Sequence, residues 1–284
     1  PLYVQSGLLM RLLCIGDNVV DRYLDRGTMY PGGNCVNVAV FAARGGAEAA
    51  YAGILGDDAA GQLVLAALQA EGVDTSHVVV EHGDNAYALV ELIDGDREFL
   101  GSDKGVSLFD LDQRAVALAK GYDIVHTAYS QRWEDQVLRL VEAGCTVAYD
   151  YGRNYSPASI AKVPGLWLAA FSGSHLDEAG LEQVAQAALE AGAHYVLITQ
   201  GADGATLWSG QQRWHQSADH VTVVDTLAAG DAYLASLIVS LADGADETPA
   251  MAKASAASAR VITVWGAFGH GAPDQGAPVK QGVN

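Results

Sequence analysis

Amphipathic helical patterns alternate along this chain with short, nearly continuous apolar runs. Apolar side chains at helical spacing predict helices over residues 59–71, 134–143 and 178–190. Apolar runs predict strands over residues 12–16, 145–151, 194–199 and 220–224. Strands that are apolar on both faces must be covered on both faces. The pattern therefore indicates an α/β fold with a mostly parallel central sheet between two layers of helices.

Two segments interrupt this alternation. Residues 86–100 alternate apolar and polar side chains and contain Asp94-Gly95, a dipeptide favoured in two-residue hairpin turns. Residues 21–31 are polar and rich in turn formers, without helical spacing. Short β elements outside a parallel core often cover a ligand site. We therefore expect a small β-sheet lid built from segments near 21–31 and 86–101.

No long linker or internal repeat divides the 284 residues, a length sufficient to bury a sizeable core. We expect a single domain over residues 11–272. Residues 1–10 are expected to be an extension outside this domain, and residues 273–284 a C-terminal tail.

The charge of the chain restricts its partners. It carries 34 acidic and 16 basic residues, a net charge of −18, whereas nucleic acids and anionic membranes select clustered Lys and Arg. No apolar run reaches the roughly 20 residues that cross a membrane. The three cysteines are widely spaced and no secretory signal opens the chain, so we expect a cytoplasmic protein with reduced thiols. An anionic small ligand stays compatible, because a local group of backbone amides can bind it.

Several catalytic motifs are absent from the sequence. It contains no G-x-x-x-x-G-K-[ST], no G-x-G-x-x-G, no G-x-S-x-G and no H-E-x-x-H. The eight histidines show no paired metal-ligand spacing. His126 follows the apolar run YDIV, which favours a packing role at a strand end.

Residues 223–238, VVDTLAAGDAYLASLI, combine a loop with the start of a helix. Small residues in a first helical turn leave backbone N–H groups open to an anion such as a phosphoryl group. Asp231 would repel that anion unless it faces another partner, for example a substrate hydroxyl that it deprotonates. The alternative is that Asp231 only complements the helix dipole and Asp225 only caps the helix. The spacing alone leaves both interpretations open.

The heptapeptide D-T-L-A-A-G-D at 225–231 resembles the anion-hole signature D-T-x-G-A-G-D of the PfkB/ribokinase family of sugar kinases, with Ala228 in place of the commonest Gly. The resemblance implies a ribokinase-like three-layer α/β/α fold with a small β-sheet lid. It implies that Asp231 is the catalytic base and that Asp225 and Thr226 lie beside the nucleotide, near a site for a monovalent cation such as K⁺. The backbone amides implied to form the anion hole are those of Ala228, Ala229 and Gly230.

The segment 32–39, GGNCVNVA, resembles the N-terminal signature G-G-x-x-x-N-x-A of the same family. This resemblance implicates Gly33, Asn34 and Asn37 in binding sugar hydroxyls; the alternative is a glycine turn with an asparagine cap. Segments 16–23 and 32–40 look most like those of fructoselysine 6-kinases, whose acceptor carries a secondary ammonium group. Such an acceptor would explain the acids Asp17 and Asp21, although Asp17 alone is equally compatible with capping a loop.

The nucleotide side of the resemblance is partial. Residues 199–204, TQGADG, resemble the family turn T-x-G-x-x-G, which implies that Thr199, Gly201 and Gly204 line an ATP groove. The family element N-x-x-E corresponds best to residues 175–178, where His175 replaces Asn. Glu178 would then act on Mg²⁺ through water, or would be only a first-turn helix acid. The helix pattern at 251–262 fits either a cover over the adenine or core packing.

Together these features predict an ATP- and Mg²⁺-dependent kinase that phosphorylates a primary hydroxyl of a sugar or fructosyl-amino acid. Arg97 or Arg153 is a candidate for binding phosphate or acceptor, and the lid is expected to form a homodimer. Two alternatives stay open: a ribokinase, nucleoside or 2-keto-3-deoxygluconate kinase of the same family, and a catalytically inactive sugar- or nucleotide-binding regulator.

Overall fold

The computed structural model describes residues 9–93, 96–129, 134–274 and 276, without side chains for residues 92–99. Within these residues, nine strands form the central sheet. In sheet order these are β13 (Gln212–Gln216), β12 (Ala205–Ser209), β11 (Tyr195–Thr199), β10 (Leu168–Ser172), β9 (Val147–Asp150), β8 (Ile124–Ala128), β1 (Arg11–Ile15), β4 (Glu48–Gly56) and β5 (Asp74–Glu81). Neighbouring strands from β5 to β11 run parallel, and β12 and β13 extend the sheet in antiparallel pairing. The predicted mostly parallel sheet is confirmed.

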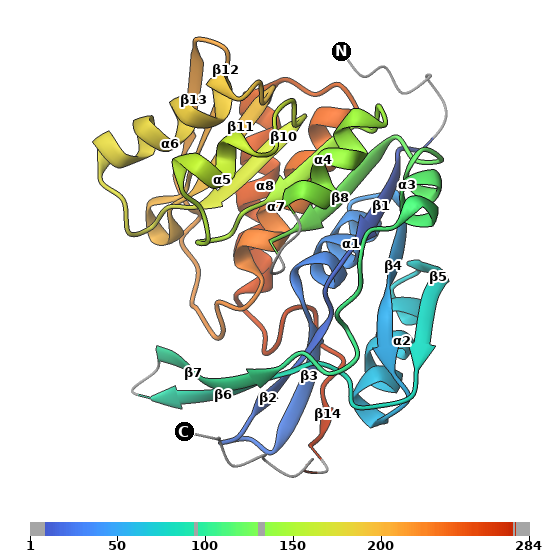
Figure 1. The fold of residues 1–284 in the computed structure, drawn as a ribbon. Coiled ribbons are helices and arrows are strands. Elements are labelled where there is room, and N and C mark those ends of the chain that lie inside the picture. Colours follow the sequence, from blue (N-terminus) through green and yellow to red (C-terminus); the bar gives the residue numbers. More distant parts are fainter. Residues whose placement is uncertain (1–8, 94–95, 130–133, 275, 277–284) are drawn as a thin grey trace.

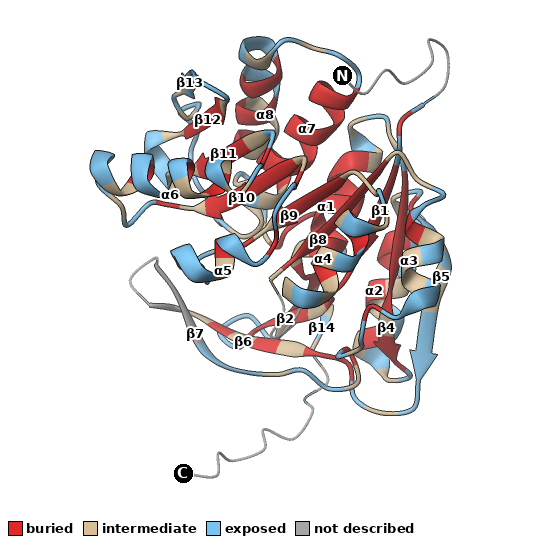
Figure 2. Cartoon of the chain, turned by 45° about the horizontal axis from the view of Figure 1, so that its top comes forward, coloured by how far each residue is buried: buried red, intermediate tan, exposed pale blue. Residues whose placement is uncertain are grey.

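Helices cover both faces of this sheet (Figure 1). One face packs against α1 (Asn34–Arg44), α2 (Ala59–Ala70), α7 (Ala229–Ala242) and α8 (Glu247–Val261). The other packs against α3 (Gln113–Ala119), α4 (Glu134–Glu142), α5 (Pro157–Ala161) and α6 (Glu178–Glu190). Figure 2 shows the central strands and α7 buried, and the outer sides of α5 and α6 exposed. The three-layer α/β/α architecture therefore follows from strands that are apolar on both faces.

A second, smaller sheet projects from the layered body at the lower end of Figure 1, and its residues Val20 and Met29 pack into the core on the α1 and α2 side. Its strands, in sheet order, are β14 (Ala272–Pro273), β3 (Thr28–Gly32), β2 (Val19–Tyr23), β6 (Tyr87–Ile93) and β7 (Asp96–Asp103). Strands β6 and β7 pair antiparallel up to Ile93 opposite Asp96, as a hairpin requires. The predicted turn at Asp94-Gly95 lies outside the described residues. The small sheet expected from segments 21–31 and 86–101 is confirmed.

The packed chain extends slightly beyond both ends of the predicted domain. Met10 is 1% exposed, and its carbonyl accepts the N–H of Glu48. At the other end Pro273 lies in β14, and Asp274 forms a buried ion pair with Arg22 at 2.6 Å. No helix in the described ranges has the length and apolar character of a membrane span.

The predicted strand at 220–224 is wrong. These residues form an irregular segment, and Val223 is 53% exposed. The N–H groups of Val224 and Asp225 donate to the carbonyl of Ile262 at 2.8 and 3.2 Å, so this backbone pairs with the end of α8 and not with a strand. The apolar side chains that suggested a strand border a cavity, described below.

Candidate active site

The first turn of α7 forms a cradle of backbone amides. Ala228, the N-cap residue, adopts the left-handed conformation with φ of 59°. Within the described part of the chain, the N–H groups of Ala228, Gly230 and Asp231 have no acceptor. Unpaired first-turn amides and the positive end of the helix dipole favour an anion at this position.

Asp225 ties the loop before α7 to two other parts of the fold. It is 4% exposed, and its Oδ1 accepts the N–H of Leu227 at 3.0 Å. Its Oδ2 accepts the hydroxyl of Tyr23 at 2.6 Å and the N–H of Gly266 at 3.0 Å. Because Tyr23 belongs to β2, the small sheet and the amide cradle are joined through this carboxylate.

Two amide side chains hold the carboxylate of Asp231 in the first turn of α7. Asn34 Nδ2 donates to its Oδ1 at 2.8 Å, and Asn37 Nδ2 donates to its Oδ2 at 2.6 Å. Burial raises the pKa of Asp231 to about 8; the bond from Asn37 opposes this shift, and the negative charges of nearby carboxylates add to it. A carboxylate with a pKa near neutrality is well suited to accept a proton.

A second carboxylate, Asp150, lies beside Asp231 at the end of β9. Its Oδ1 accepts the N–H of Gly152, and its Oδ2 accepts Asn34 Nδ2, both at 2.7 Å. Burial raises the pKa of Asp150 to about 6, against the effect of these two hydrogen bonds. Asn34 therefore bridges Asp150 and Asp231 with one amide group.

A cavity of about 400 Å³ opens between the end of β1 and the small sheet. Asp17 and Asp21 line it on one side, and Ser102, Asp103 and Lys104 line it from the end of β7 and just beyond. The negative charges of Asp17 and Asp21 help to raise the pKa of Asp231. Asp17 accepts the backbone N–H of Asn34, whose side chain donates to Asp231, so the cavity lies close to that carboxylate. Its polar lining suits a hydroxylated acceptor.

The residues around this cavity are held tightly. Asp17 accepts the N–H groups of Asn34 and Cys35 at 3.0 and 3.2 Å, so it caps α1 as well as lining the cavity. Gly33 precedes α1 with φ of 101°, and a Cβ there would lie 2.8 Å from Asn18 Cα. Glycine is therefore required at position 33 by both its backbone conformation and this close approach.

A second cavity, of about 390 Å³, ends at the amide cradle. Ala229 and Gly230 line it beside Ser258 of α8, and the irregular segment contributes Val221 and Val223. The predicted nucleotide-side residues that also line it are Thr199, Gly201, Gly204 and Thr226. An apolar cavity that leads to open helix N-terminal amides has the form expected of a nucleotide site.

The sequence profile described as pfkB family carbohydrate kinase matches residues 9–273, a range that includes both cavities and the amide cradle. The chain belongs to the pfkB family of carbohydrate kinases.

Two known kinases resemble the chain over almost their whole length. Fructosamine kinase FrlD of Bacillus subtilis is 37% identical over 270 residues, covering 93% of this chain and 95% of that protein. Fructoselysine 6-kinase of Escherichia coli is 37% identical over 259 residues, covering 90% and 99%.

Solved structures of kinases share the fold at lower sequence identity. Ribokinase of Arabidopsis thaliana, complexed with ribose and ATP, aligns with a TM-score of 0.78 at 20% identity, covering 92% of this chain and 95% of that one. Aminoimidazole riboside kinase of Salmonella enterica aligns with a TM-score of 0.72 at 24% identity, covering 91% and 95%. The predicted ribokinase-like fold is confirmed.

In this pfkB kinase, two residues that contact the site were given no site role from the sequence: Asp150 was not singled out, and His126 was expected only to pack at a strand end. His126 lies within β8, not at its end, and its Nε2 is 2.7 Å from Asn34 Oδ1. Asp150 had one usable signal: it ends an apolar strand of a parallel sheet, at the edge where such folds bind ligands. Arg97 lies in β7, and its side chain is outside the described residues.

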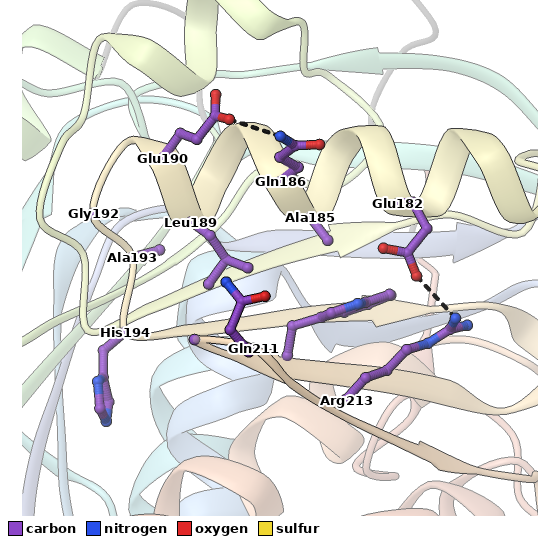
Figure 3. Close-up of a pocket in the computed structure, with 12 residues that line it drawn as sticks. Glu182, Ala185, Gln186, Leu189, Glu190, Gly192, Ala193, His194, Gln211 and Arg213 are labelled. Carbon is purple, nitrogen blue, oxygen red and sulfur yellow. Dashed lines mark hydrogen bonds and ion pairs between the residues drawn. The ribbon is translucent and has the colours of Figure 1, made fainter.

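Other predicted residues lie apart from both cavities. Glu178 forms an exposed ion pair with Arg213, which also binds Glu182 at 2.9 Å. Figure 3 shows Glu182 and Arg213 across a wider groove of about 910 Å³ between α6 and the β12–β13 hairpin, which contains none of the site residues above. Arg153 donates to Ser174 Oγ at 2.8 Å. The roles of Glu178 and Arg153 stay predictions.

Ala228 allows a direct test of the cradle. We expect Ala228→Gly to keep kcat within about twofold, because glycine adopts the left-handed conformation without the roughly 1–2 kcal/mol cost that other residues incur. Ala228→Val should lower both kcat and the melting temperature, because a β-branched residue is strained in this conformation. Steady-state kinetics and thermal unfolding measure both effects. Equal activity of the two variants would contradict a role for the conformation of residue 228.

Proposed function

We propose that this chain transfers the γ-phosphoryl group of ATP to a primary hydroxyl of a fructosyl-amino acid. The observation that carries the proposal is the position of Asp231. It carries one of the open N–H groups of the α7 cradle, and its carboxylate is held by Asn34 and Asn37. Asn34 also donates its backbone N–H to Asp17, which lines the first cavity.

In the proposed reaction the acceptor hydroxyl donates its proton to Asp231 while its oxygen attacks the γ-phosphorus. A new O–P bond forms, the bond between the γ-phosphorus and the bridging oxygen breaks, and ADP leaves. The open amides of Ala228, Gly230 and Asp231 hold the oxygens of the transferring group, whereas the predicted N–H of Ala229 donates to the carbonyl of Thr226 at 3.4 Å. The charges do not conflict, because Asp231 faces the hydroxyl and the amides face the phosphoryl group.

The nucleotide is assigned to the cavity lined by Thr199, Gly201, Gly204 and Thr226, with the adenine against α8. Mg²⁺ would arrive on the phosphates and neutralise their charge. Within the described ranges no group of three or more His, Cys, Asp or Glu side chains is arranged around a metal position, which suits an ion held mainly by phosphates and water. Glu178 would act on it through water. A K⁺ ion would lie in the loop that Asp225 supports.

The acceptor assignment rests on charge and on the relatives. The first cavity presents the carboxylates of Asp17, Asp21 and Asp103 against the single ammonium of Lys104. A fructosyl-amino acid carries a cationic secondary amine next to the sugar, and carboxylates stabilise such a cation at close range. The names of two relatives, fructosamine kinase and fructoselysine 6-kinase, indicate acceptors of this class.

We expect Asp21→Asn to raise KM for fructosyl-lysine by about 10- to 100-fold, the range for a lost charge-assisted hydrogen bond. KM for ATP should change little, because Asp21 lines the other cavity. Asp25→Asn, which removes an exposed charge beyond the end of β2, is the matched control. An unchanged KM for the acceptor in Asp21→Asn would contradict this assignment.

The small sheet acts as a lid over the acceptor and pairs with the same sheet of a second copy, because its strand β7 forms one edge and carries the exposed Leu100. Light scattering on the purified protein tests for the dimer. The protein works in the cytoplasm, where its three free cysteines stay reduced.

Two alternatives are distinguished by a substrate panel. A ribokinase, nucleoside or 2-keto-3-deoxygluconate kinase would use the same base with another acceptor. A catalytically inactive regulator would bind sugar or nucleotide without turnover. The carboxylate of Asp231, with its raised pKa and its position beside the cradle, favours a catalyst over a regulator.

A further inference from the structure

One buried histidine contacts the candidate site. His126 is fully buried in β8, and its Nε2 lies 2.7 Å from Asn34 Oδ1. Burial lowers the pKa of His126 to about 3, so the imidazole is neutral near neutral pH and carries one N–H. With Asn34 Oδ1 facing Nε2, that hydrogen lies on Nε2, because an amide oxygen can only accept. The competing acceptor is the backbone of Ala148, which also acts on the imidazole, although Nδ1 has no hydrogen-bond partner among the described residues.

The amide of Asn34 has one orientation that satisfies all its neighbours. Its Nδ2 donates to Asp231 Oδ1 at 2.8 Å and to Asp150 Oδ2 at 2.7 Å, which uses both amide hydrogens. Turning the amide over would place its oxygen against two carboxylates, which lose their donor when ionised. The two carboxylates therefore assign oxygen and nitrogen in Asn34, and the proton on Nε2 of His126 follows from that assignment.

We propose that His126 and Asn34 are positioning residues for the base: His126 holds the Asn34 amide so that it can only donate to Asp231 and Asp150. The inference rests on the proposed role of Asp231 as base. Donation to a carboxylate stabilises its ionised form, which is the form that accepts the acceptor proton. The ordering acts through a chain of hydrogen bonds, so His126 touches neither acceptor nor nucleotide.

The alternative orientation of Asn34 shows what His126 prevents. When Asp231 is protonated, a free amide would turn and accept the new O–H, which stabilises the neutral acid. Asp150, Asp17 and Asp21 already favour the neutral acid by their charge, and Asn37 favours the ionised form. The N–H of His126 holds the Asn34 amide in its donating orientation, so that Asn34, like Asn37, stabilises the ionised form of Asp231.

The test is the pH dependence of kcat/KM for the acceptor in His126→Phe and His126→Gln, measured from about pH 5.5 to 9.5. In His126→Phe the donor is lost. The acid limb, the part of the profile in which kcat/KM falls as the pH is lowered, should therefore shift to higher pH by about one unit, and kcat/KM at neutral pH should fall about tenfold. KM for ATP should not change. In His126→Gln the side-chain amide restores a donor near the position of Nε2, and at least half of the shift should be recovered.

Thr127→Val is the matched control, since Thr127 is the next residue of β8 and is equally buried. It should leave the acid limb in place. A His126→Phe enzyme that is less stable but keeps the normal acid limb would overturn the proposal, as would a His126→Gln enzyme that recovers nothing. If His126→Phe does not fold, Asn34→Ala must move the limb in the same direction, because the cap from Asp17 uses only the backbone of residue 34.

A measurement without turnover separates this inference from the proposed function. Nitrogen-15 NMR of the imidazole should show His126 neutral, with its proton on Nε2, down to about pH 5. A protonated imidazole there, or a proton on Nδ1, would overturn the inference even if the kinase reaction is confirmed. Conversely, the expected tautomer with no phosphoryl transfer to any sugar would remove the proposed function and leave only the hydrogen-bond chain.

Discussion

Asp231→Asn is expected to lower kcat by about 10³-fold, within the range of about 10² to 10⁴ found when a general base is lost. Asparagine has nearly the same shape but does not take up a proton at neutral pH. The affinity for ATP should stay within about threefold, because the amide cradle and the nucleotide cavity do not depend on the carboxylate. Steady-state kinetics and nucleotide titration on the same preparation measure the two quantities.

The pKa of Asp231 also predicts the direction in which Asp231→Asn changes the stability of the fold. Burial raises the pKa of Asp231 in the folded chain, so the ionised carboxylate is destabilising, and stability is lost as the pH rises toward about 8. Removing the carboxylate should therefore not lower the melting temperature at or above that pH. Asp243→Asn, at the exposed C-terminal cap of the same helix, should retain full activity. A folded Asp231→Asn enzyme that keeps more than about a tenth of kcat would show that Asp231 is not the base.

The second large effect is the pH dependence of the reaction. If Asp231 must be ionised, kcat/KM for the acceptor should approach a tenfold fall per pH unit below its pKa of about 8, which gives about 50-fold between pH 8 and pH 6. The measured value belongs to Asp231 and Asp150 together, because one amide bridges the two carboxylates. Initial rates at low acceptor concentration, over a range of pH, give this profile directly.

Asp150→Asn tests whether the charge of Asp150 raises the pKa of Asp231. The charge of Asp150 raises the pKa of Asp231, so removing it should move the acid limb to lower pH. Asp110→Asn, which removes an exposed carboxylate before α3, should leave the limb in place. A limb that stays in place or moves to higher pH in Asp150→Asn would contradict electrostatic coupling between these two groups.

The positive charge of the acceptor should also shift the pH profile of the reaction. An ammonium group beside Asp17 and Asp21 would offset their negative charge, so the acid limb of kcat should lie at lower pH than that of kcat/KM. Neutral fructose should not show this difference. If fructosyl-lysine and fructose gave identical pH profiles, the carboxylates would not recognise the cationic amine.

The parts of the molecule built from local patterns could be predicted from the sequence. Continuous apolar strands between amphipathic helices led to the parallel layered sheet, and the Asp94-Gly95 turn signal led to the β6–β7 hairpin. The D-T-L-A-A-G-D segment led to the helix start and its open amides because all its parts lie within one loop and one helical turn.

The parts that depend on distant contacts could not be predicted. Asn34 meets His126 and Asp150 across 92 and 116 positions of sequence, and no local pattern links these residues. The strand predicted at 220–224 was wrong for a related reason. Val221 and Val223 border the cavity that ends at the amide cradle, and an apolar run looks the same in sequence whether it faces a core or a cavity.

Phosphorylation of a primary hydroxyl of a fructosyl-amino acid, as proposed above, can be tested directly. The purified protein is incubated with ATP, Mg²⁺ and fructosyl-lysine, and the new phosphate is located by phosphorus–proton correlation NMR. We expect one ADP for each product molecule, a single phosphate ester on O6, and a far lower kcat/KM for fructose, ribose and 2-keto-3-deoxygluconate. Turnover of ribose without turnover of fructosyl-lysine, or a phosphate on a secondary hydroxyl, would contradict the proposal.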